Sequence, residues 1–252
     1  MLTTTLALDL VANLLSCVIY LAVARIVAAR PVDAKAVSAR RAFAWWWDVL
    51  ALLALYGAFA DAVTMAGAWT VPLLVAAVHV LLLAILLGLA GLLYYLVYLY
   101  TGREGAWKPI VLFYGLFWAF LVYWIEALQP NGIQPGVITP QLSYVHDPKD
   151  SAFGPLLGLL LILPIIGGAV GYFTLFFRAH ETTQRYRIAV VSLSILLWFS
   201  FSLVGSLLEV NQSLAWTILS RTISLAAALC VYGAYRPPRW VQRRWGVQGV
   251  GS

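Results

Sequence analysis

Long runs of apolar residues, separated by short polar segments, dominate the chain from one end to the other. A helix of about 20 mostly apolar residues is needed to cross the roughly 30 Å hydrocarbon core of a membrane. The sequence has runs of that length at residues 5–28, 43–66, 72–100, 109–128, 155–177, 188–208 and 214–235. We therefore predict an all-α integral membrane protein, a seven-transmembrane helix bundle over residues 1–236.

The composition supports a membrane protein. Hydrophobic residues make up 63% of the chain and charged residues 10%, whereas soluble domains carry about 25% charged residues. The first apolar run has no basic residue before it and is followed by Arg25 and Arg30. A cleavable signal peptide has the opposite order of charge and a shorter apolar core, so we expect this run to remain as the first helix.

Basic residues fall almost entirely on one side of the predicted membrane. The first, third and fifth connections and the tail contain 14 of the 16 lysines and arginines. Because Lys and Arg in short loops favour the cytoplasmic side, we predict an outside N-terminus and a short basic cytoplasmic tail over residues 237–252. The net charge of +6 is explained by this asymmetry, so no nucleic-acid partner is predicted. The expected location is the plasma membrane.

Aromatic and small residues add two local predictions. Trp45, Trp46 and Trp47 precede the second apolar core, as in the aromatic belts that anchor helices at the membrane surface. In the fifth run, Pro164 predicts a kink and Gly167-x-x-x-Gly171 predicts a flat surface for a neighbouring helix.

Ionisable residues inside membrane spans are costly and mark functional sites by default. Those within or at the edges of the spans are Asp9, Asp48, Asp61, His79, Glu126, Glu209 and Arg221. All but Asp48 fall in the outer half. Arg221 requires a carboxylate or carbonyl partner at its depth, and we expect Asp61 or Glu126 to supply it, with Glu209 as a partner at the rim. By analogy with other bundles, Asp61, His79 and Arg221 form one group, whereas Asp9 is expected to be solvated.

Two interpretations of this outer polar cluster stay open. Interhelical ion pairs and hydrogen bonds also serve simply to hold helices together. Alternatively, the cluster forms a ligand- or proton-responsive site. The candidate ligand-binding residues are Asp61, His79, Trp118, Glu126, Trp198 and Arg221.

The sequence argues against several cofactors and reactions. The lysines, Lys35, Lys108 and Lys149, all lie outside the spans, so a covalent retinal Schiff base in the seventh helix is rejected. His79 is the one histidine inside a predicted span, which argues against bis-histidine haem. Cys17 and Cys230 have neither CxxC spacing nor a histidine companion, so no metal site is predicted. Motifs for serine or cysteine nucleophiles are absent, and we predict a non-enzymatic protein.

The order of features resembles the seven-transmembrane sensor modules of bacterial membrane-bound histidine kinases. The similarity lies in Arg40-Arg41 before the Trp-rich helix, a Pro-rich loop over residues 130–153, the segment 183–187, and Tyr235-Arg236-Pro237-Pro238 after the last span. The resemblance implies either a stand-alone receptor that signals through a separate partner protein, since no kinase or cyclase follows in this sequence, or a member that has lost signalling.

The expected function is a sensor that binds a small or lipophilic ligand in the outer half of the bundle, within the lipid bilayer. One alternative is a small transporter or proton-coupled permease that uses Asp61 and Glu126. A further alternative is an accessory subunit of a larger membrane complex.

Overall fold

The computed structural model describes residues 2–30, 34–68, 70–123, 153–207 and 214–247, and within these ranges it contains helices and no strand. The long helices are α1 (Leu2–Ala29), α2 (Val37–Met65), α3 (Val71–Thr101), α4 (Trp107–Tyr123), α5 (Phe153–Thr174), α6 (Thr182–Leu207) and α7 (Leu214–Tyr235). A short helix, α8 (Arg239–Trp245), follows, and three 3-10 turns cover Ala34–Ala36 (η1), Glu104–Ala106 (η2) and Leu175–Phe177 (η5).

Within the described residues, each of the predicted apolar runs forms a helix. Five stretches are long and apolar enough to cross a membrane: Leu6–Ala29, Val37–Met65, His79–Thr101, Glu104–Tyr123 and Ile218–Tyr235. A shorter apolar stretch covers Leu161–Phe177. The all-helical, membrane-type fold is therefore confirmed, while the count of seven spans and their orientation stay predictions. The predicted Pro-rich loop over residues 130–153 lies almost wholly outside the described residues.

The sequence sets the ends of α3 clearly. The Thr70 side chain accepts a hydrogen bond from the backbone N–H of Leu73 at 3.4 Å, and Pro72 occupies the first turn, where its missing N–H costs nothing. Gly102 ends the helix with a φ of 68°, a left-handed conformation that glycine adopts without a steric penalty.

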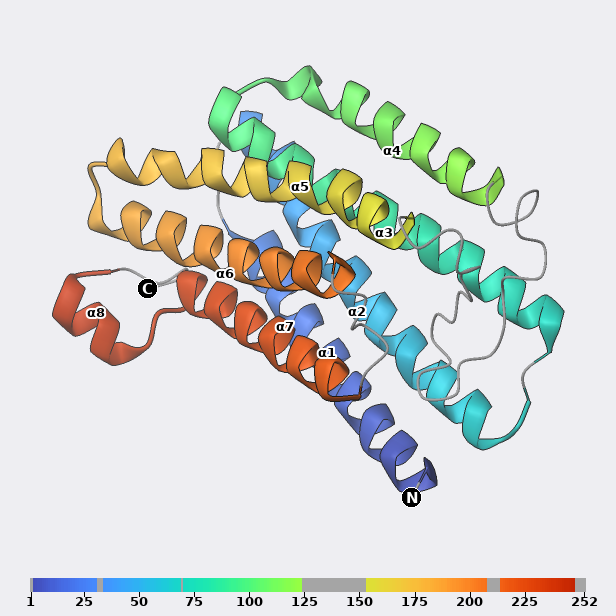
Figure 1. The fold of residues 1–252 in the computed structure, drawn as a ribbon. Coiled ribbons are helices and arrows are strands. Elements are labelled where there is room, and N and C mark those ends of the chain that lie inside the picture. The colour runs from blue at the N-terminus through green and yellow to red at the C-terminus, as the bar shows by residue number, and fades with distance from the viewer. Residues whose placement is uncertain (1, 31–33, 69, 124–152, 208–213, 248–252) are drawn as a thin grey trace.

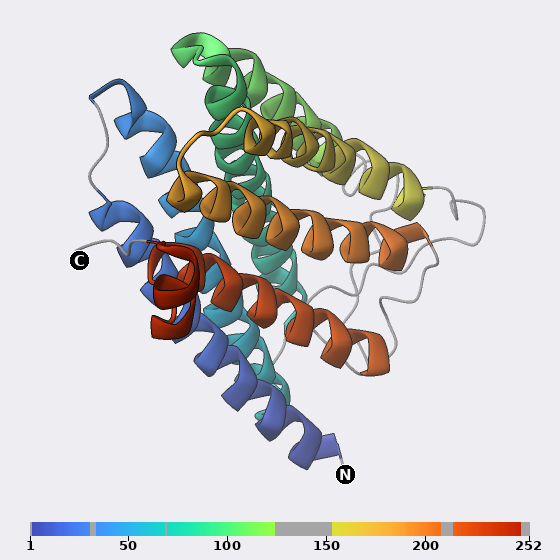
Figure 2. The ribbon, with the colours of Figure 1, turned by 90° about the vertical axis from the view of Figure 1, so that its left-hand side faces the viewer.

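Six of the long helices form a closed ring. Contacts link α1 to α2, α2 to α3, α3 to α5, α5 to α6, α6 to α7, and α7 back to α1. Helix α4 packs chiefly on α3 and lies along one edge of the bundle (Figures 1 and 2). The ring therefore encloses an interior to which α4 does not belong.

Aromatic side chains fill the middle of this ring. Trp46 and Trp47 are only 4% and 2% exposed, and both pack against Trp198 of α6. Their predicted role in a membrane-surface belt is wrong, because both side chains are buried inside the ring against α6. Of the three tryptophans, Trp45 alone is exposed.

Glycines allow close approaches between helices. A Cβ on Gly88 of α3 would lie 2.9 Å from a methyl group of Val49, and a Cβ on Gly168 of α5 would lie 3.2 Å from Leu96. Of the two predicted contact glycines, Gly167 has nothing within 4 Å of its Cβ position, whereas a Cβ on Gly171 would lie 3.9 Å from the Tyr100 ring of α3. The predicted contact is therefore confirmed for Gly171 and wrong for Gly167, and α5 continues through Pro164 without interruption.

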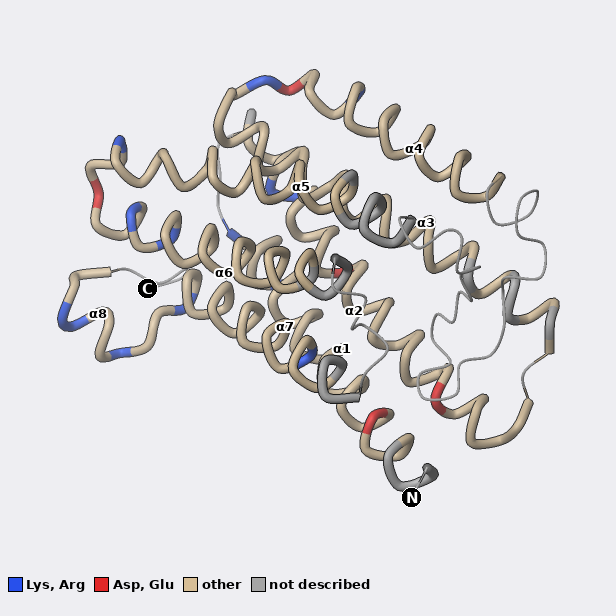
Figure 3. Tube along the Cα trace, viewed as in Figure 1, with Lys and Arg blue, Asp and Glu red and all other residues tan. Residues whose placement is uncertain are grey.

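Charge divides the two ends of the bundle. Figure 3 shows Lys and Arg gathered where α8 and the α5–α6 connection lie. We call this the basic end, and it contains Arg30, Arg40 and Arg187. The opposite end, where α1 begins, contains Asp9 and Asp61, and we call it the N-terminal end.

Candidate functional site

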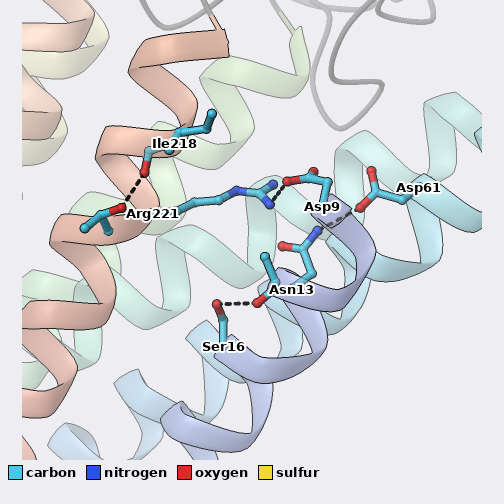
Figure 4. Close-up of polar contacts among 8 residues, drawn as sticks. Asp9, Asn13, Ser16, Asp61, Ile218 and Arg221 are labelled. Carbon is cyan, nitrogen blue, oxygen red and sulfur yellow. Dashed lines mark hydrogen bonds and ion pairs between the residues drawn. The ribbon is translucent and has the colours of Figure 1, made fainter. Parts of the chain in front are cut away.

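An ion pair joins the first and last helices of the ring at the N-terminal end. Arg221 of α7 donates from its guanidinium Nη1 to the Asp9 carboxylate of α1 (Figure 4). Both side chains are 22% exposed. The sequence-based choice of Asp61 as the partner is wrong, and so is the expectation that Asp9 is simply solvated. Asp9 is the partner of Arg221 because α1 and α7 are direct neighbours in the ring.

Asp61 instead bonds to an amide one turn along α1 from Asp9. Asn13 donates from Nδ2 to Asp61 Oδ2 at 2.9 Å, and Asp61 is 1% exposed (Figure 4). Gly57 makes this approach possible, because a Cβ there would lie 2.8 Å from the Asn13 amide nitrogen. The other carboxyl oxygen of Asp61, Oδ1, is buried without a hydrogen-bond partner among the described residues.

The other predicted site residues are distributed over the bundle. His79 lies partly buried on α3. Trp118 lies on α4, outside the ring, and its buried indole N–H has no hydrogen-bond partner within the described part of the chain. Trp198 belongs to the aromatic core with Trp46 and Trp47. Glu126 and Glu209 fall outside the described residues.

The structure brings together a different set of residues at the basic end, around a cavity of about 720 Å³. That volume is in the range of small-molecule sites. Every ring helix contributes to its wall, directly or through the turn that flanks it. The lining residues are Val27, Arg30, Ala36, Ala39, Arg40, Phe43, Tyr95, Leu99, Tyr172, Leu175, Glu181, Thr183, Gln184, Arg187, Ile188 and Tyr235.

The wall of this basic-end cavity changes from apolar to charged toward its rim. Phe43 and Tyr95 are buried and stack with ring centroids 4.2 Å apart, and Tyr172 meets Tyr95 edge-on at 6.2 Å. Glu181 and Gln184 are exposed at the rim. A ligand with an apolar part and a charged group would therefore find matching surfaces here.

Positive charge exceeds negative charge in the cavity. Arg30, Arg40 and Arg187 face one acidic side chain, Glu181, among the described lining residues. Burial and the neighbouring charge of Arg30 both lower the pKa of Arg187. Like charges held this close indicate a place where an anion would be stabilised.

From the sequence, these arginines contribute only to the predicted orientation of the chain in the membrane. Arg30, Arg40 and Arg187 lie in connections or within the first two helical turns, where basic residues are expected at the cytoplasmic side of any membrane protein. Nothing in their spacing shows that three connections converge. The one local hint is Tyr94-Tyr95, because a buried tyrosine hydroxyl usually requires a hydrogen-bond partner.

The described residues contain no group of three or more His, Cys, Asp or Glu side chains that could hold a metal ion. The resemblance to sensor modules of histidine kinases stays a prediction. No protein-family model matches the chain, and no curated protein or solved structure matches it significantly.

Proposed function

We propose that the chain is a seven-span protein of the plasma membrane with its basic end in the cytoplasm, and that it acts as a receptor-like sensor without catalytic activity. Five membrane-length helices support the membrane assignment. The helices α5 and α6 lie within the same ring as four of them. The concentration of Lys and Arg at one end supports the orientation.

Cysteine labelling on intact cells tests the orientation. Cys17 and Cys230 are replaced by alanine, and a single cysteine is then introduced as Arg41→Cys at the basic end or Ala68→Cys at the N-terminal end. A membrane-impermeant maleimide should label Ala68→Cys in intact cells and Arg41→Cys only after lysis. The reverse pattern would overturn the proposed orientation.

The observation that carries the sensor proposal is the cavity lined from all six ring helices. A molecule in this place contacts every element of the ring, so its binding energy can favour one arrangement of the helices over another. We therefore place the ligand site at the basic end. The outer-half site expected from the sequence has less support, because its described acidic and basic members, Asp61 and Arg221, already bond to α1.

A cavity-filling substitution tests whether occupancy moves helices. In the cysteine-free protein, spin labels are attached through Ala28→Cys on α1 and His180→Cys in the α5–α6 connection, across the ring. Leu99→Trp adds bulk to the cavity wall and should shift the distance between the labels by about 1–2 Å in electron paramagnetic resonance.

Leu112→Trp is the matched control, because Leu112 lies 63% exposed on α4, outside the ring. It should leave the distance unchanged. If Leu99→Trp also leaves it unchanged while the protein folds, the ring is rigid. The reading as an accessory subunit of a larger complex would then be favoured.

A proton-coupled transporter is the second candidate, and the buried, unpartnered Oδ1 of Asp61 favours it. A carboxyl group placed in this way can take up a proton at that oxygen. Proteoliposomes with an internal pH dye measure proton flux for the wild type and for Asp61→Asn, which keeps the shape of the side chain. Flux that depends on Asp61 would support transport, and the absence of flux from the wild type would support the sensor.

A further inference from the structure

The arginines at the basic-end cavity are held by the ring itself. Arg40 of α2 donates from Nη1 to the backbone carbonyl of Arg30. Arg187 of α6 donates from Nε to the carbonyl of Ala234 on α7 at 3.4 Å. The Arg30 guanidinium lies over the Tyr235 ring, 5.6 Å from its centroid. These contacts hold the three side chains in position around the cavity.

Arg40 also has a donor that the protein does not use. Its Nε is buried and has no hydrogen-bond partner among the residues that the structure describes. A buried donor without a partner costs free energy. An acceptor that enters the cavity would recover this energy, so the geometry prepares a bond to a ligand.

We propose that the basic-end cavity binds a phosphoryl group between the guanidinium groups of Arg30, Arg40 and Arg187. Among the described lining residues, three positive charges face the one carboxylate of Glu181, an excess that suits a dianion. A carboxylate ligand would neutralise only half of that excess. Guanidinium forks match the oxygen spacing of phosphate, and Tyr95 and Tyr172 line the same cavity within electrostatic reach of Arg30.

The phosphoryl group has two possible sources, a soluble phosphate compound and a phospholipid head group. Helix α8 lies next to the end of α7 and exposes Trp240 and Trp245 beside Arg243 and Arg244, a composition suited to a membrane surface. The inference rests on the proposed function in one respect only, that the cavity is a ligand site.

Thermal unfolding of the full chain in detergent, followed by tryptophan fluorescence, tests the proposal. Inorganic phosphate is titrated against potassium chloride at matched ionic strength. In a second arm, phosphatidic acid is added to the micelles and compared with phosphatidylcholine. We expect saturable stabilisation of the wild type by inorganic phosphate, by phosphatidic acid, or by both, and the arm that responds identifies the source.

Three variants and a control locate the effect. Arg30→Gln and Arg187→Gln should each weaken phosphoryl binding about tenfold or more, as expected for the loss of one charge-assisted hydrogen bond. Arg40→Lys keeps the charge and removes Nε, and should weaken binding by a similar factor. Arg41→Gln removes an exposed charge from the neighbouring position on α2 and should leave binding unchanged.

No stabilisation of the wild type in either arm would overturn the proposal, and this result needs no variant to fold. If Arg41→Gln and Arg187→Gln weakened phosphoryl binding equally, the proposal would also be overturned, because the binding would then reflect general attraction to a basic surface. If neither phosphoryl compound stabilises the protein while Leu99→Trp still moves the spin labels, the proposed ligand class is wrong and the sensor proposal is retained. If a phosphoryl compound binds without moving the labels, the ligand class is supported and the sensor proposal is wrong.

Discussion

The two ends of the six-helix ring place arginine in opposite situations. At the N-terminal end, Arg221 has Asp9 as its partner, and the neighbouring acid, Asp61, is bonded to Asn13. At the basic end, three arginines share one cavity with a single described acid, Glu181. The ion pair and hydrogen bond at the N-terminal end join helices to one another. The described residues at the basic end have an excess of positive charge that an anionic ligand could neutralise.

This contrast shows that depth in the membrane alone does not identify a binding site. Arg221 is the more unusual residue by its position in the sequence, yet it pairs with a carboxylate of the chain itself, that of Asp9. Arg40 is ordinary by position, yet its Nε is buried and unused within the described structure. The balance of charge between neighbours separates a helix–helix contact from a candidate ligand site.

The largest effect should follow from breaking the ion pair at the N-terminal end. Arg221→Leu leaves the Asp9 carboxylate partly buried without its counter-charge, and we expect a loss of about 2–3 kcal/mol in the free energy of unfolding. Denaturation of the purified protein in mixed micelles measures it. The double variant Asp9→Leu/Arg221→Leu should recover most of the loss, and failure to recover would show that the carboxylate is not the cause.

A steric change at the same end should have the next largest effect. Gly57→Ala places a methyl group against the Asn13 amide, which must move away from Asp61. We expect a loss of about 1–3 kcal/mol in unfolding free energy, as for other over-packed contacts. Gly167→Ala on α5 is the control, because its methyl group meets nothing within 4 Å. It should be neutral or stabilise by up to about 1 kcal/mol, and equal losses in both variants would contradict the assigned contact.

The second polar link between α1 and α7 should contribute less. The Tyr20 hydroxyl and the Ser224 hydroxyl form a hydrogen bond between these helices. A double-mutant cycle with Tyr20→Phe and Ser224→Ala should give a coupling free energy of about 0.5–1 kcal/mol, which is typical of hydroxyl pairs between membrane helices. A coupling of zero would mean that packing alone closes the ring.

The smallest effect should come from the basic end. In phosphate-free buffer, Arg30→Gln removes a contact with the Tyr235 ring and also relieves the repulsion with Arg187. These two changes oppose each other, so we expect a net change within about 0.5 kcal/mol in unfolding free energy. A loss as large as that of Arg221→Leu would remove the contrast between the two ends.

The helices could be predicted from the sequence because their signal is local. Each apolar run is read without knowledge of its neighbours, and α3, for example, begins and ends within one residue of the predicted run at 72–100. The partner of Arg221 could not be predicted in this way. Asp9 is 212 positions away, and the choice between it and Asp61 depends on the order of helices around the ring.

The site was harder to predict for the same reason. The cavity is lined by residues of different helices, such as Tyr95, Tyr172 and Arg187. No local sequence pattern predicts that these residues lie close together. Trp46 and Trp47 illustrate the problem on a smaller scale. A Trp-rich helix end predicts both membrane anchors and core residues, and only the packing of α2 against α6 distinguishes them.

Closure of the ring by α1 and α7 has a consequence for biosynthesis. Asp9 and Tyr20 are made at the start of translation, but their partners, Arg221 and Ser224, are made near its end. Until α7 has been inserted, α1 carries an unpaired carboxylate and an unpaired hydroxyl on a face that opens toward lipid. Nascent chains interrupted before α7 therefore display a polar helix surface that the cell's membrane quality control can recognise.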